Sequence, residues 1–142
     1  MKAKEILLGG LILVSSISSA YSEELIAKSE YFSVHADKEV MAEALLEDLN
    51  LDELYLQVCD ILDIHIYDLR ITLKITSDKL TFYSHEEKTI YISSSEFDRY
   101  KLGHEISHAI INNYFVITPS VKLQEILCGY VEYTLRKDNE TK

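Results

Sequence analysis

Two histidines four residues apart constrain the fold of this chain more than any other feature. They belong to the segment His104-Glu105-Ile106-Ser107-His108. On an α-helix, residues at this spacing project from one face, one turn apart. Apart from Glu105, the positions next to the two histidines carry no charge. The segment therefore predicts a helix that is buried against a sheet, with its histidine face open.

The same spacing is typical of a zinc site that activates water. Two neutral imidazoles one turn apart can both reach a Zn²⁺ ion at ~2.0–2.1 Å. Glu105 is rotated by about 100° from His104, close to where a metal-bound water would lie. Zinc lowers the pKa of that water toward ~7, so the glutamate can accept its proton and later pass it to a leaving amine. The alternative is a pair of surface histidines on an ordinary amphipathic helix.

A catalytic zinc site needs a third protein ligand and an open fourth position. The metzincin pattern would place a histidine at Tyr114 and a glycine at Ile111, so that pattern is excluded. The segment 124–133 instead resembles the E-G-L-A-E-Y-V stretch of the gluzincin peptidases (peptidase MA-like), with Glu125 at the ligand position. Tyr130 and Val131 fall in register with it.

This resemblance implies a zincin-like fold and a function. It implies one Zn²⁺ held by His104, His108 and Glu125, with Glu105 as the general base in the hydrolysis of peptide bonds. Tyr130 is a candidate to stabilise the oxyanion of the tetrahedral intermediate. His35 and the other histidines lack ligand spacing and are expected on the surface or in strands: His65, His85.

The chain departs from the family pattern at two positions. The glycine after the glutamate ligand is Ile126, and the acid four residues after the ligand is Gly129. Asn112, one turn beyond the second histidine, is therefore a candidate to orient that histidine. Glu132, seven residues after Glu125 and on the same helix face, is the alternative third ligand.

Residues 1–20 have the pattern of a secretory signal peptide. Lys2 and Lys4 give a positive start, an apolar run follows from Ile6 to Val14, and small residues end at Ala20. The alternative is a retained membrane anchor, for which this run lacks the ~20 apolar residues of a spanning helix. We therefore expect cleavage after Ala20, a secreted or periplasmic protein and no stable membrane anchor.

The composition bounds the partners. A net charge of −10 argues against nucleic acid and anionic membranes, which carry the same sign. A peptide or protein substrate is expected. Larger gluzincins add a subdomain that closes the cleft, so the alternative function is a non-catalytic or partner-dependent binding or regulatory module. Cys59 and Cys128 can form one disulfide or remain two buried thiols.

Residues 21–142 are expected to form one α+β domain. Some segments show the alternating apolar pattern of strands and others the helical spacing of apolar residues. The first helical pattern predicts a long helix with Asp37 as a possible N-cap and an interruption near Asn50. The expected elements are a strand at 31–35, a long helix at 38–63, a strand at 71–76, a hairpin of 80–83 with 89–93, and helices at 96/98–113 and 121–136. The strand at 89–93 is either a sheet edge that aligns an extended peptide or an ordinary strand.

Overall fold

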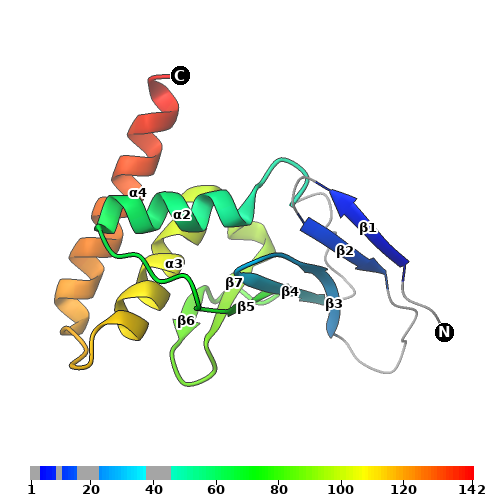
Figure 1. Ribbon diagram of the computed structural model, residues 1–142, viewed down its shortest axis with the longest axis horizontal. Helices are drawn as coiled ribbons and strands as arrows, with labels where there is room; N and C mark the ends of the chain where they lie inside the picture. The colour runs from blue at the N-terminus through cyan, green and yellow to red at the C-terminus, as the bar shows by residue number, and fades with distance from the viewer. Residues whose placement is uncertain (1–3, 9–10, 16–22, 38–45) are drawn as a thin grey trace.

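The computed structural model describes residues 4–8, 11–15, 23–37 and 46–142 (Figure 1). These residues form an α+β fold with one mixed sheet. The elements in chain order are β1 (Lys4–Leu8), β2 (Leu11–Ser15), β3 (Glu23–Lys28), β4 (Phe32–Asp37), α2 (Leu51–Leu62), β5 (Ile71–Thr76), β6 (Phe82–Ser84), β7 (Thr89–Ser93), a 3₁₀ turn (Ser94–Glu96), α3 (Arg99–Tyr114) and α4 (Val121–Glu140).

The sheet has the strand order β1-β2-β3-β4-β5-β7-β6. Strands β4, β5 and β7 are parallel to one another, while β6 runs antiparallel to β7 and ends the sheet. Val34, Leu73 and Ile90 lie in register across the three parallel strands, and all three are fully buried. Alternate residues of a strand point to opposite faces, so this row belongs to the face that forms the core.

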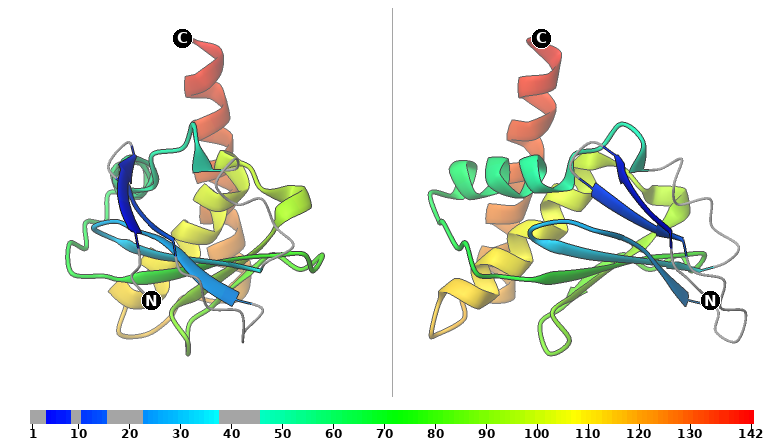
Figure 2. Two further views of the ribbon diagram at one scale, coloured as in Figure 1. Left: turned by 90° about the vertical axis from the view of Figure 1, so that its right-hand side faces the viewer. Right: turned by 45° about the vertical axis from the view of Figure 1, so that its right-hand side comes forward.

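Helix α3 lies at the centre of the helix packing. It packs against α2 and α4 as well as against β6 and β7, and in Figure 1 it lies at the side of the molecule opposite β1 and β2. A methyl group added at Gly103 of α3 would collide with the side chain of Leu135 of α4. The absence of a side chain at Gly103 therefore lets the two site helices approach closely. The C-terminal part of α4 projects beyond the rest of the fold (Figure 2).

The helices expected at 96/98–113 and 121–136 are confirmed as α3 and α4. The Asp98 side chain accepts a hydrogen bond from the backbone N–H of Lys101 and caps α3. The Ser120 hydroxyl accepts one from Leu123 and caps α4, which is longer than expected at its C-terminal end. The hairpin of β6 and β7 and the strand β5 also lie where alternation predicts them.

The long helix expected at 38–63 is confirmed from Leu51 onward, and its expected interruption near Asn50 is present. Asp37, its expected N-cap, is the last residue of β4 and accepts a hydrogen bond from the backbone of Ser77. Residues 38–45 lie outside the described residues. The helix α2 begins only at Leu51, because the Asn50 side chain accepts the N–H of Glu53 and starts a new helix there.

The N-terminal region adds strands that the sequence pattern did not predict. β3 pairs antiparallel with β4 and carries an irregularity between Leu25 and Ala27, which breaks a clean alternation. β1 and β2 form a hairpin within the expected signal segment. Cleavage after Ala20 stays a prediction, because residues 16–22 lie outside the described residues. Within the described part of the chain, no helix has the length and apolarity needed to cross a membrane.

Candidate metal centre

Helices α3 and α4 bring the two histidines and Glu125 together. The Nε2 atom of His108 lies 2.8 Å from one carboxylate oxygen of Glu125, and the Nε2 atom of His104 lies 3.3 Å from the other. The two imidazole rings have centroids 5.3 Å apart. Zinc bond lengths of ~2.0–2.2 Å place tetrahedral donor atoms roughly 3.3–3.5 Å apart. The 3.3 Å separation of His104 and Glu125 matches that spacing, whereas the 2.8 Å between His108 and Glu125 is a hydrogen-bond distance that an ion between them would lengthen.

The opposite nitrogen of His104 faces a second carboxylate. Its Nδ1 lies 3.2 Å from Oε2 of Glu132, whose other oxygen accepts a 3.0 Å hydrogen bond from Arg136. The Arg136 guanidinium in turn lies over the ring of Tyr100, 4.4 Å from its centroid. Glu132, the alternative third ligand from the sequence, thus occupies the position of a group that orients His104.

The opposite nitrogen of His108 faces the amide of Gln124. The amide nitrogen of Gln124 donates to the carbonyl of Pro119 at 2.9 Å, so its oxygen is the atom that faces the histidine. That oxygen lies 3.0 Å from Nδ1 of His108 and also accepts a hydrogen bond from Asn112 at 2.8 Å. Asn112, the predicted orienting residue, therefore acts through Gln124 rather than on the imidazole ring.

These partners determine the protons on the two imidazoles. Every side chain that faces the four ring nitrogens of His104 and His108 presents an oxygen acceptor. Nδ1 must carry a proton to donate to Glu132 or Gln124. Both Nε2 atoms face Glu125, so a cation bound among the three groups would have two imidazoles and a carboxylate as donors, a set that fits zinc.

Cys128 is a possible ligand that the sequence analysis missed. Its sulfur and one nitrogen each of His104 and His108 all lie within 4.8 Å of one another. Both cysteines are free and buried, so the disulfide alternative does not hold in this structure. Burial raises the pKa of the Cys128 thiol above its ordinary value. Glu125 has carboxylate oxygens 2.8 Å from His108 and 3.3 Å from His104, and it stays a candidate third ligand beside Cys128.

Glu105 lies beneath the two histidines and is only 8% exposed. Burial away from water raises the pKa of its carboxyl, and the nearby His108 and His104 partly oppose that shift. A raised pKa moves a carboxylate toward the range in which it can accept and return a proton near neutral pH. The position of Glu105 therefore suits the general base expected from the sequence.

A cleft of about 370 Å³ opens beside these side chains. Its walls are the edge of the sheet on one side and α3 and α4 on the other. Lining residues are Thr81, Tyr83, His85, Glu105, His108 and Glu125. The short strand β6, rather than β7, forms the sheet edge here, because β7 is paired with β5 and β6. Of the two alternatives for 89–93, the ordinary strand is therefore correct and the sheet edge is not.

The remaining candidates lie in different places. Tyr130 is 56% exposed and does not line the cleft described above. Tyr83 does line it, and its hydroxyl accepts a 3.0 Å hydrogen bond from Asn113, although no sequence spacing singled it out. His85, expected to be an ordinary surface residue, also lines the cleft, whereas His65 pairs with Asp60 on the surface.

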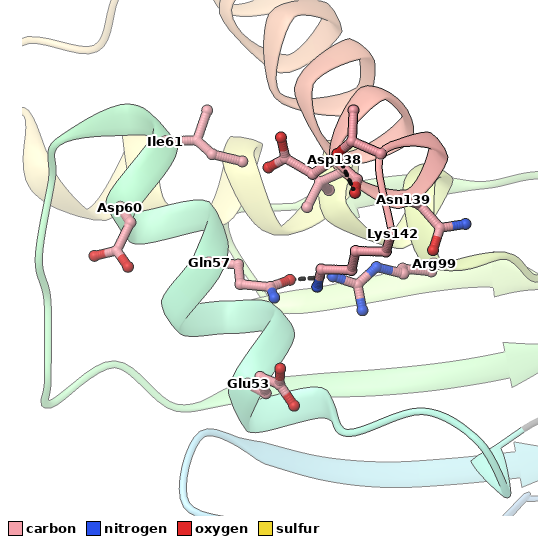
Figure 3. Close-up of a pocket in the computed structure, with 10 residues that line it drawn as sticks. Glu53, Gln57, Asp60, Ile61, Arg99, Asp138, Asn139 and Lys142 are labelled. Atoms are coloured by element: carbon pink, nitrogen blue, oxygen red, sulfur yellow. Dashed lines mark hydrogen bonds between the residues drawn. The ribbon is translucent and has the colours of Figure 1, made fainter.

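A second hollow, of about 420 Å³, lies away from these residues between α2 and the C-terminal part of α4 (Figure 3). Its side chains include both acids and bases, such as Glu53, Asp138 and Lys142, and Gln57 accepts a hydrogen bond from Arg99 across it. These residues carry acidic, basic and amide side chains, and none belongs to the group of possible metal ligands found among the described residues. This hollow contains none of the site residues predicted from the sequence.

Comparison with known proteins gave no match: no family model, no curated protein and no solved structure is similar to this chain.

Proposed function

We propose that this protein is a zinc-dependent peptidase of the gluzincin type with a zincin-like fold. The observation that carries the proposal is the arrangement of acceptors around His104 and His108. Glu132 and Gln124 face the two Nδ1 atoms, and both Nε2 atoms converge on Glu125. Such outer partners are typical of metal-binding histidines, whose ring orientation they hold.

The side chains around the ion would divide the work of hydrolysis. When bound, zinc supplies a Lewis acid and lowers the pKa of its water. Glu105 accepts the proton of the attacking water and later delivers it to the leaving amine. Tyr83 and His85 line the cleft from the sheet side and are candidates to donate a hydrogen bond to the oxygen that gains charge.

The sheet edge supports a peptide rather than a compact substrate. β6 pairs with β7 along one side, so its other side is the outer edge of the sheet. An extended chain can add to such an edge through backbone hydrogen bonds. A peptide placed along β6 would pass in front of Glu105 and His108, which line the same cleft.

The test compares Glu105→Gln with the wild type and with Glu140→Gln, a control at the exposed end of α4. Purified wild type should contain one zinc per chain and cleave unfolded protein substrates. Glu105→Gln should keep the zinc and lose about 10²–10⁴-fold in rate, because only the general base is removed. Protein prepared without chelators that contains no stoichiometric zinc would refute the proposal.

A second function is favoured by the outer face of α4. Leu123, Ile126, Tyr130 and Tyr133 recur at helical spacing and are 47–61% exposed. An apolar stripe of this kind on a helix is typical of a protein contact surface. The alternative is therefore a module that keeps the metal and binds a partner protein. Zinc binding without hydrolysis of any unfolded substrate by the isolated chain would favour this module over the peptidase.

A further inference from the structure

Cys128 lies on the same helix as Glu125, three residues further on and therefore on a neighbouring part of the same face. Its side chain is fully buried, whereas the Glu125 side chain is 53% exposed. The two residues thus approach the histidine pair from different sides, Glu125 from the solvent and Cys128 from the protein interior. The side chains of His104 and His108, 19% and 15% exposed, lie between these extremes.

The distances allow a fourth bond from the protein. Zinc binds nitrogen at ~2.0–2.1 Å and sulfur at ~2.3 Å, which puts tetrahedral nitrogen and sulfur atoms roughly 3.5 Å apart. The donor atoms of His104, His108 and Cys128 lie within 4.8 Å of one another. Because 4.8 Å is an upper limit, a shift of roughly 1.3 Å at most would complete the bond, and a small side-chain rotation on these two packed helices can supply it.

We propose that Cys128 is a fourth ligand to the metal held by His104, His108 and Glu125, and that it closes the site at rest. This inference rests on the proposed function, because it concerns the same ion. Sites with four protein ligands are structural, whereas catalytic sites keep one position for water. The cysteine thus controls whether the site can hydrolyse.

The closed form, with Cys128 as a ligand, and the open form, with water in its place, would interconvert by exchange of one ligand and one proton. When the Cys128 sulfur binds, the thiol releases its proton to solvent and the bound water leaves; when water returns, the sulfur takes a proton back. Hydrolysis then requires displacement of the sulfur by water during binding of the substrate. The sulfur also sets the class of metal, because thiolate ligands favour zinc over magnesium or calcium.

X-ray absorption of the zinc-loaded protein tests this directly. We expect a sulfur neighbour at ~2.3 Å in the wild type, in addition to nitrogen and oxygen neighbours at ~2.0–2.2 Å. Cys128→Ala should lose the sulfur shell, bind zinc at least about tenfold more weakly and hydrolyse substrate faster. Cys59→Ala is the matched control, since Cys59 is the other fully buried thiol and lies on α2.

The outcomes separate this inference from the proposed function. Wild-type protein that binds one zinc with only nitrogen and oxygen neighbours would overturn the role of Cys128 and leave the His104–His108–Glu125 site intact. Wild-type protein that binds no zinc would overturn both. Cys128→Ser offers a second variant if the alanine variant fails to fold, and the wild-type spectrum decides the question without either.

Discussion

Replacement of Gln124 by leucine is expected to weaken zinc binding although Gln124 touches no metal. Gln124 is 6% exposed, and its amide makes three hydrogen bonds, with His108, Asn112 and the Pro119 carbonyl. Leucine has a similar volume but leaves those three groups without this partner. Loss of outer partners of metal-binding histidines typically costs 10–100-fold in metal affinity. At about 1 kcal/mol for each hydrogen bond, the metal-free protein should lose about 3 kcal/mol of stability.

Two matched variants separate orientation of the histidine from simple loss of packing. Gln57→Leu makes the same chemical change on α2, away from the site, and should leave zinc affinity unchanged. Gln124→Glu keeps an oxygen acceptor for His108 but turns an oxygen toward the Pro119 carbonyl. It should therefore lose stability while retaining more zinc affinity than the leucine variant.

The assays are zinc competition against a chelator and urea denaturation of the metal-free protein. The reasoning would be refuted if Gln124→Leu bound zinc as tightly as the wild type while losing the expected stability. In that case the amide would serve only to pack α4 against α3, and the tautomer of His108 would be set by other groups.

Three further results are expected. Glu105→Gln should raise the melting temperature of the metal-free protein at neutral pH but not near pH 4. Because burial raises the pKa of the Glu105 carboxyl, the wild type has a stability cost that appears as pH rises above the ordinary pKa of 4.5. A pH series of melting curves that shows no such difference between the two proteins would contradict this. Chelation should lower the melting temperature of the zinc-loaded wild type, by the equivalent of about 2.7 kcal/mol at a free zinc concentration of 100 times Kd, and have no effect on His104→Ala. Gly129→Ala should stabilise α4 by about 0.5–1 kcal/mol, because a methyl group there meets no atom within 4 Å. Gly103→Ala should instead destabilise the protein, because its methyl group would collide with Leu135 of α4. Urea denaturation that ranks the two variants in the opposite order would refute this.

The parts of the fold that depend on near neighbours in sequence were predictable. The α3 helix follows from its apolar positions and from Asp98 as a cap, and α4 begins where Ser120 can cap it. The break before α2 was visible at Asn50 for the same reason. β3 was not predictable, because its six residues lack clean alternation and it exists only through pairing with β4.

The site divides in the same way. The sequence alone determined that His104, Glu105 and His108 share one helical turn and that Glu125 lies on the next helix, because helical spacing is a local property. Only the tertiary structure decided that Glu132 and Gln124 face the two Nδ1 atoms and that the Cys128 sulfur lies within 4.8 Å of the two histidines. Glu132 lies 28 residues after His104, and Gln124 lies 16 residues after His108. The close packing of α3 on α4 at Gly103 selects them, and no periodicity within either helix encodes that crossing.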